Sequence, residues 1–273
     1  DLHSFPTRRS SDLHIALDLA AQVRVGLIDG GVDRSHAVFS HGTIHEYGCE
    51  RAIPSAHGTA IASLIAGYGA DFHGAAPGAT LYVADVYCGA GTGGAVDAVA
   101  EAFAWLSRER VPVVNVSLVG PANRMLEQIV RIVIARGSIV VAAVGNDGPS
   151  APPLYPAAYP GVVAVTAVDA RRRVLIEACR GPHVAFAAPG ADMPAATTPQ
   201  AFALVRGTSF AAPLIAGLLA MELQVNKASA DAAIAALTAQ AVDLGARGRD
   251  KVYGNGLVGE ALRMPEKLAK ATE

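Results

Sequence analysis

Several segments of this 273-residue chain are continuous apolar runs of strand length, and these constrain the fold more than any other feature. Clear examples are Val23–Ile28 and Ser138–Ala143, which are largely apolar and are followed by turn residues. Strands of this kind are buried on both faces, as is typical of a parallel sheet with helices on each side. The sequence therefore predicts an α/β fold of three layers, with a doubly wound, mostly parallel sheet between two layers of helices.

The rest of the chain alternates between strand and helix patterns in the same way. Further strands are predicted at Thr80–Tyr87, Pro112–Ser117, Val162–Val168 and Val184–Ala187, and helices at Ala95–Arg108, Arg124–Arg136, Phe210–Leu223 and Asp231–Ala241. A chain of this length that is 52% hydrophobic can bury one large core. We therefore expect a single domain over residues 20–265, with an N-terminal tail over 1–19 and a C-terminal tail over 266–273.

The first residues differ in kind from the rest. Residues 1–12 show no periodic pattern, and the chain lacks an initiator methionine and a visible signal peptide. They fit a linker, a processing remnant or a non-native adapter sequence, and we leave them out of the fold prediction. The short apolar piece Ile15–Ala21 fits either the domain or a pro-region.

Charge and hydropathy exclude some classes of function. The net charge of −2 favours neither a nucleic-acid partner nor an anionic membrane surface. The longest apolar segment, Phe210–Leu223, is shorter than the roughly 20 residues that a membrane-spanning helix needs. A soluble protein without a membrane span is expected.

A glycine turn that carries a hydroxyl leads into this apolar segment. The sequence Gly207-Thr208-Ser209 places Ser209 where a helix begins, so that the helix dipole and backbone N–H groups face any negative charge beside it. Such a serine can attack a carbonyl group. Taken alone, it fits a simple helix N-cap better than a nucleophile.

Three further polar residues lie where the same sheet edge is expected. Asp29 ends the strand Val23–Ile28, His57 opens an apolar helix, and Asn146 follows the strand Ser138–Ala143. Catalytic groups gather at the carboxyl edge of an α/β sheet. A serine nucleophile needs a base, a carboxylate that orients the base, and an oxyanion donor, and each role has one candidate here.

The ordered set of motifs resembles the subtilase family of subtilisin-like serine peptidases. Besides the four residues, the strings "GAAPGATLYVADVY", "VNVSLVGP", "YPAAYPGVVAVTAVD", "APG" and "YGNGLV" occur in the family's order between about Val23 and Leu262. The resemblance implies that Ser209 is the nucleophile, His57 the general base and then acid, Asp29 its orienting carboxylate, and Asn146 the oxyanion donor. It also implies an extended peptide or unfolded protein as substrate, and a pro-segment as a further partner.

The resemblance also places the substrate between two segments. One contains Gly91, Thr92 and Gly93, and the other contains Ser117, Leu118 and Val119, with Val144 and Gly145 beside Asn146. The glycine-rich stretch 89–94 also matches the G-x-G-x-x-G pattern of dinucleotide-binding proteins. That alternative lacks its acidic residue, because Asn115 lies near the end of the next strand.

Departures from the family pattern predict properties of this particular chain. Val119 and Leu154 replace smaller residues, so we expect a narrow first pocket that prefers small or aliphatic side chains before the cut. Phe210 stands where many subtilisins have an oxidisable methionine, so we expect resistance to peroxide. Val38 and a loop with Asp71 as its only carboxylate stand where calcium ligands are common, so no cofactor is expected to be required and no tight calcium site is expected there.

The cysteines and one histidine pair have less specific interpretations. Cys49, Cys88 and Cys179 allow at most one disulfide, and we favour small buried hydrophobic residues over a disulfide framework. His41 and His45 have metal-ligand spacing but fall in an expected loop, so no metal site is predicted.

Two alternatives to a hydrolase stay open at this point. One is a catalytically quiet domain that binds peptides, and the other is a transpeptidase or cyclase that uses the same acyl-enzyme. The intact set of four residues argues against a quiet domain. By family resemblance alone, we expect a secreted or periplasmic protein.

Overall fold

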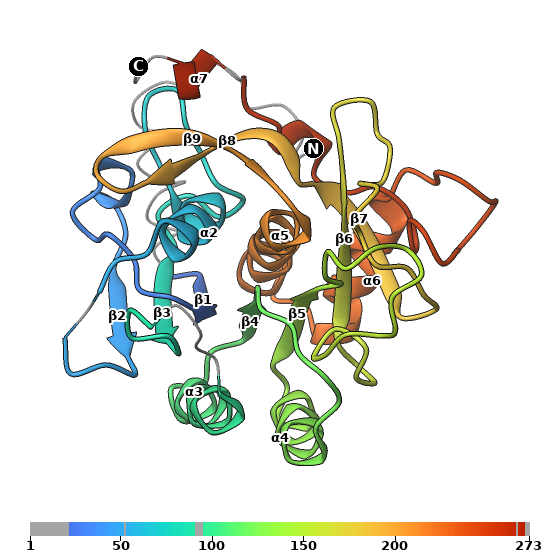
Figure 1. Cartoon of the computed structure of the whole chain (residues 1–273), viewed down its shortest axis with the longest axis horizontal. Coiled ribbons are helices and arrows are strands. Elements are labelled where there is room, and N and C mark those ends of the chain that lie inside the picture. The colour runs from blue at the N-terminus through green and yellow to red at the C-terminus, as the bar shows by residue number, and fades with distance from the viewer. Residues whose placement is uncertain (1–21, 52, 91–94, 266, 271–273) are drawn as a thin grey trace.

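A seven-stranded sheet, parallel throughout, forms the centre of the molecule in the computed structural model, which describes residues 22–51, 53–90, 95–265 and 267–270 (Figure 1). The strands lie in the order β2-β3-β1-β4-β5-β6-β7. Their bounds are β1 Arg24–Asp29, β2 Ile44–Tyr47, β3 Thr80–Asp85, β4 Val113–Val116, β5 Ile139–Ala143, β6 Val163–Val168 and β7 Val184–Pro189. The predicted parallel sheet is confirmed.

Helices cover both faces of this sheet (Figure 1). Helices α2 (Ala56–Ala66) and α5 (Ala212–Val225) pack on one face, while α3 (Val96–Arg108) and α4 (Arg124–Ala135) pack on the other. The buried apolar residues accordingly form two clusters, one on each side of the sheet. The remaining helical segments are η1 Ala37–Phe39, η2 Thr208–Phe210, α6 Ala230–Gln240, η3 Glu260–Leu262 and α7 Lys267–Lys270. The three-layer prediction is therefore confirmed.

Strand β1 lies at the point where the winding of the sheet reverses. After β1 the chain builds β2 and β3 on one side of it and then crosses to build β4 and β5 on the other. At such a point the loops that follow neighbouring strands diverge and leave a crevice. The carboxyl ends of β1, β4 and β5 thus form the edge on which the site is built.

Two strand features of the fold differ from the sequence prediction. His45 lies in β2, an edge strand, where a loop was expected. An antiparallel hairpin of β8 (Ala191–Thr197) and β9 (Ala201–Arg206) was not predicted, and Pro194 within β8 weakens its strand pattern. The hairpin covers α2, and the Ala196 N–H donates to Ser63 Oγ at 3.0 Å.

The apolar helical stretch around α5 is longer than predicted. Together with η2 it runs over Thr208–Val225, which is 18 residues with a mean hydropathy of 1.4. By length and composition alone this stretch could cross a membrane, so the expectation that it is too short was wrong. Its position explains its composition, because 56% of the stretch is buried and α5 lies against the central strands (Figure 1). The core helix of an α/β domain needs the same apolar surface.

Candidate active site

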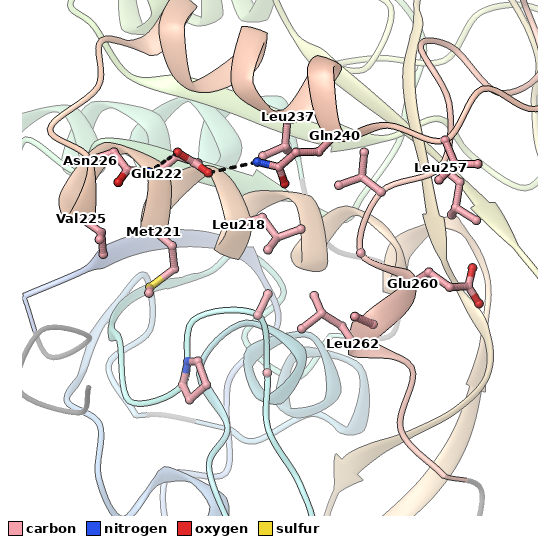
Figure 2. Close-up of a pocket in the computed structure, with 17 residues that line it drawn as sticks. Leu218, Met221, Glu222, Val225, Asn226, Leu237, Gln240, Leu257, Glu260 and Leu262 are labelled. Atoms are coloured by element: carbon pink, nitrogen blue, oxygen red, sulfur yellow. Dashed lines mark hydrogen bonds between the residues drawn. The ribbon is translucent and has the colours of Figure 1, made fainter. Parts of the chain in front are cut away.

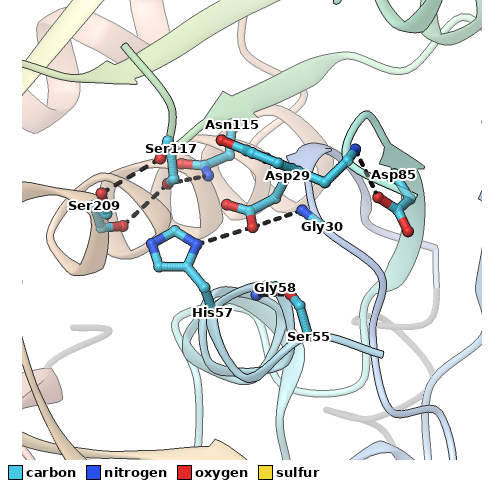
Figure 3. A network of polar contacts seen from close by, with 10 residues as sticks. Asp29, Gly30, Ser55, His57, Gly58, Asp85, Asn115, Ser117 and Ser209 are labelled. Atoms are coloured by element: carbon cyan, nitrogen blue, oxygen red, sulfur yellow. Dashed lines mark hydrogen bonds and ion pairs between the residues drawn. The ribbon is translucent and has the colours of Figure 1, made fainter. Parts of the chain in front are cut away.

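Asp29 and His57 form a hydrogen-bonded pair at the carboxyl edge of the sheet (Figure 3). Asp29 is the last residue of β1 and is 2% exposed. Its Oδ1 accepts hydrogen bonds from the Gly30 N–H at 2.7 Å and from His57 Nδ1 at 2.9 Å. Since a carboxylate only accepts, the proton of the neutral imidazole is on Nδ1, and Nε2 is left as the base.

The start of α2 explains why His57 can reach Asp29. Ser55 caps the helix, and its Oγ accepts from the Gly58 N–H at 2.9 Å. A Cβ added to Gly58 would lie 2.7 Å from the Gly31 carbonyl oxygen and still closer to that of Gly30. Only glycine at position 58 therefore allows the first turn of α2 to lie directly against the end of β1.

Two opposing effects set the pKa of His57. Burial lowers this pKa, whereas the hydrogen bond and the negative charge of Asp29 raise it, and the net result is a pKa above 6.5. Asp29 therefore stabilises the imidazolium that forms when His57 takes up a proton. The histidine side chain is still 42% exposed, so a substrate can reach it.

Ser209 lies in the short helix η2, on the other side of the His57 ring from Asp29 (Figure 3). The α-helix itself begins only at Ala212, later than the predicted start at Phe210. Ser209 Oγ donates to the Ser117 carbonyl at 3.3 Å, and Ser117 Oγ donates to the Ser209 carbonyl at 3.0 Å. No hydrogen bond joins Ser209 to His57 among the described residues, so Oγ must turn away from Ser117 before His57 can take its proton. Such contacts often tighten only when substrate binds.

Asn146, in the loop after β5, is held with its amide N–H₂ group free to donate. Its Oδ1 accepts from the Thr208 N–H at 3.0 Å and from Thr208 Oγ1 at 3.1 Å. Thr208 is fully buried, and its Oγ1 also accepts from the Gly145 N–H at 3.2 Å. Thr208 thus positions the Asn146 side-chain amide, the predicted oxyanion donor. Sequence reasoning missed this role, although the threonine next to Ser209 was visible.

The predicted substrate residues fall into three groups. Ser117, Leu118 and Val119 follow β4 at the catalytic edge, and Val119 is 40% exposed. Residues Gly91, Thr92 and Gly93 lie outside the described residues, as do residues 1–21 and 271–273. The Val144 side chain is fully buried, and its N–H is bound to the Val165 carbonyl, so its side chain does not line the cleft.

Two cavities lie near the predicted catalytic residues. The first, which we call the His57-side cavity, measures about 510 Å³. Its lining includes Asp29, His57, Ile53, Tyr87 and Gly89. The other, the Leu154 pocket, measures about 570 Å³ and is lined by residues that include Val119, Leu154 and Tyr155. The first cavity reaches Ser117 and the second reaches Val119, so both lie along the segment that is predicted to bind the substrate.

Leu154 narrows the second cavity next to the oxyanion loop. Gly145 has a φ of +99°, and the space that a Cβ on it would occupy is taken by the Leu154 side chain. Position 145 therefore requires glycine both for its backbone conformation and for this contact.

The cysteines differ from the interpretation that we favoured. Cys49 and Cys88 form a disulfide with a Cα–Cα distance of 5.6 Å, so they are not separate buried hydrophobic residues. Their spacing of 39 residues gave no signal, because the partners meet only through the packing of β2 beside β3. Cys179 is free and buried as expected, and burial raises the pKa of its thiol.

The remaining candidate ligands have partners within the fold. His41 lies edge-on to Tyr68, and His45 stacks on Tyr82 with ring centroids 4.7 Å apart. At the expected position of the calcium site, the Val38 carbonyl accepts from the Tyr68 N–H at 2.8 Å, and Asp71 is exposed.

A third cavity, of about 300 Å³, lies away from this chemistry (Figure 2). It is lined mainly by apolar residues between α5, α6 and the C-terminal segment, among them Leu218, Met221 and Leu257. Leu218 is about two and a half helical turns from Ser209 along the chain. Glu222 at its rim already accepts hydrogen bonds from Asn226 and Gln240, so this cavity offers no candidate for catalysis.

Comparisons with known proteins agree with this geometry. The model of the Subtilase family matches residues 20–256. Among curated proteins, the chain is 31% identical to the minor extracellular protease Epr of Bacillus subtilis (strain 168), with 86% of this chain and 37% of Epr covered. It is 31% identical to subtilisin DY of Bacillus licheniformis, with 87% and 89% covered, and 32% identical to subtilisin BL of Lederbergia lenta, with 86% and 88% covered.

A solved structure shows the same fold. The prenylagaramide maturation protease PagA superposes with a TM-score of 0.77 at 24% identity, over 90% of this chain and 98% of that one. The family match covers most of the chain, and the four motif residues lie at one sheet edge. The chain therefore belongs to the subtilase family of serine-type endopeptidases.

Proposed function

We propose that this protein hydrolyses peptide bonds through an acyl-enzyme on Ser209, with Asp29, His57 and Asn146 in the roles given above. The observation that carries the proposal is the 2.9 Å contact between Asp29 Oδ1 and His57 Nδ1, with Ser209 on the opposite side of the ring. When Ser209 Oγ turns to His57 Nε2, the imidazole takes its proton as Oγ attacks the carbonyl. The Asn146 amide then donates to the oxyanion, and His57 returns the proton to the leaving amine.

Cleavage of a quenched fluorescent unfolded protein tests this proposal. We expect cleavage by the wild-type protein and none above background by Ser209→Ala. Equal cleavage by the two proteins would contradict the proposal. A second reaction contains an added peptide with a free amine, and its products are identified by mass spectrometry. Water as the acceptor gives products with a free carboxylic acid, whereas the amine gives products with a new amide bond. An excess of amide products over acid products would favour the transpeptidase alternative.

We further propose a preference for small or aliphatic side chains before the cut. The proposal is supported by Leu154, which occupies the space beside Gly145, and by Val119 on the same cavity. A peptide library tests it, and cleavage mainly after Phe or Tyr would count against it.

Two further properties are proposed from the family and from the fold. Secretion is supported by the relative that is named an extracellular protease. Independence from calcium at the usual position is supported by the Val38 carbonyl, which already accepts a backbone hydrogen bond. If EDTA lowered the melting temperature by many degrees and calcium restored it, that second proposal would be wrong.

A further inference from the structure

The Cys49–Cys88 disulfide joins two segments that are far apart in the sequence and that lead to the same cavity. Cys49 lies between β2 and α2, and Cys88 follows the end of β3 by three residues. Cys49 is half-buried and Cys88 is exposed, so a reductant can reach the bond. This disulfide takes no part in the chemistry described above.

Both segments continue directly into the wall of the His57-side cavity. The segment after Cys49 leads through Ile53 to Ser55, the residue that caps the helix of His57, and the Ser55 N–H donates to the Gly31 carbonyl at 2.9 Å. The segment after Cys88 continues with Gly89 and Ala90, which line the same cavity.

Ile53 and Gly89 meet across this wall. A Cβ on Gly89 would lie 3.0 Å from Ile53 Cδ1, so the isoleucine side chain rests on the glycine. Ile53 is 44% exposed even so. This contact is shallow, so beyond the end of the β2–β3 pairing the disulfide is the one covalent tie between the two segments.

The turn at Cys88 is held in a conformation that it would not readily adopt by itself. Cys88 has a φ of +49°, which is unfavourable for a residue with a side chain. Asp85 Oδ1 accepts from the N–H groups of Tyr87 and Cys88, each at 2.9 Å. The disulfide and these two bonds together fix the turn, and breaking the disulfide removes the one covalent link to the Cys49 segment.

We propose that the Cys49–Cys88 disulfide is a specificity-determining link, which fixes the wall of the His57-side cavity for substrates that extend beyond the residue at the cut. The proposal rests on the peptidase function proposed above. With the bond intact, the wall is already ordered before a peptide binds. Without the disulfide, the bound peptide must order both segments, and the conformational entropy that they lose weakens peptide binding.

A dithiol breaks this link by reducing the disulfide bond. The two thiols of the reductant give up two protons and two electrons in total and close to a cyclic disulfide, while the protein S–S bond takes them up and becomes two Cys–SH groups. Asp29 lies in β1, His57 in α2 and Ser209 in η2, and the disulfide joins none of these elements, so we expect the chemical step to stay unchanged. Cys49 and Cys88 are thus positioning residues that act on KM.

The test compares an extended peptide, with several residues on each side of the cut, with a single-residue ester that occupies only the catalytic centre. The proteins are the oxidised wild type, the dithiol-reduced wild type and the double variant Cys49→Ser/Cys88→Ser, with Cys179→Ser as the matched control for the free cysteine. We expect KM for the peptide to rise about tenfold without the disulfide, at unchanged kcat. Ester hydrolysis should stay the same, and Cys179→Ser should behave as wild type.

Peptide binding to Ser209→Ala, measured by fluorescence anisotropy, tests the link independently of turnover. We expect Kd to rise about tenfold on reduction. An unchanged Kd would overturn the proposal. So would an equal loss of activity towards the peptide and the ester in the kinetic test, because it would indicate a merely structural role for the disulfide. Absence of ester hydrolysis in the oxidised wild type would instead refute the proposed peptidase function, and the binding experiment would still decide on the disulfide.

Discussion

The proposed catalytic residues and the walls of the two neighbouring cavities are built in different ways. Asp29 and Asn146 lie at or just after the end of a buried strand of the central sheet, and His57 lies in the first turn of a buried helix. Ile53 and Leu154, by contrast, lie in loops whose positions depend on contacts with other loops. Groups on strand ends are held precisely, as catalysis requires, whereas loops can change without loss of the fold. We therefore expect changes at the edge to affect turnover and changes in the walls to affect selectivity.

The largest effect is expected for Asp29→Asn. The amide can hold His57 in the wrong tautomer and cannot stabilise the imidazolium, so we expect kcat to fall by about 10⁴-fold. Circular dichroism and the melting temperature provide the control for folding. A loss of less than tenfold in a folded variant would show that the carboxylate is not the orienting group.

The pH dependence of the same variant sharpens the comparison. Catalysis needs neutral His57, so wild-type activity should fall as the pH drops through its raised pKa, above 6.5. In Asp29→Asn the charge that raises the pKa of His57 is gone, while burial still lowers this pKa. The acid limb of the pH–activity profile should therefore move to lower pH. A raised folded-state pKa means that the pair stabilises the fold fully below pH 6.5 and loses this contribution as the pH rises through the folded pKa. Melting curves of wild type and His57→Ala across this range measure that difference.

A smaller loss is expected at the oxyanion donor. For Asn146→Ala we expect turnover to fall by about 10²–10³-fold, a range taken from the corresponding change in a subtilisin. Thr208→Val keeps the shape but removes the Oγ1 contacts to Asn146 and Gly145, so a loss of about 2–12-fold is expected. Steady-state kinetics measure both, and full turnover in Asn146→Ala would refute its assignment.

Leu154→Ala tests the opposite wall, where selectivity and not turnover should change. The truncation opens space beside Gly145, and we expect kcat/KM for a peptide with Phe before the cut to rise by about 10–200-fold relative to one with Ala. Ile176→Ala, at an exposed position, is a control for a general effect of truncation. If the ratio stayed constant, Leu154 would not limit the pocket.

The smallest effect concerns oxidation next to the nucleophile. The Phe210 ring lies 5.3 Å from that of His57, and phenylalanine resists mild peroxide. The wild type should keep its activity after such treatment, whereas Phe210→Met should lose most of it. Residual-activity assays with peptide mapping measure this, and inactivation of the wild type with Ser209 unmodified would point to another oxidisable residue.

The sequence allowed the catalytic edge to be predicted because its signals are local. Asp29 follows an apolar run, and His57 and Ser209 each stand close to a glycine at the start of an apolar helix. Hairpin β8–β9 is local too, but Pro194 weakens its strand pattern, whereas the Cys49–Cys88 disulfide depends on a contact between segments 39 residues apart and left no such signal. The support of Asn146 by Thr208 likewise spans 62 residues, so it appears only when the fold brings the two together.

Labelling with a fluorophosphonate tests the central claim most directly, because it reports a nucleophilic serine without any assumption about the substrate. The purified wild type is compared with Ser209→Ala and His57→Ala, and the adduct is located by peptide mass spectrometry. We expect an adduct on Ser209 in the wild type and none in either variant. A folded wild-type protein that is not labelled, or that is labelled at another residue, would contradict the account and favour a quiet peptide-binding domain.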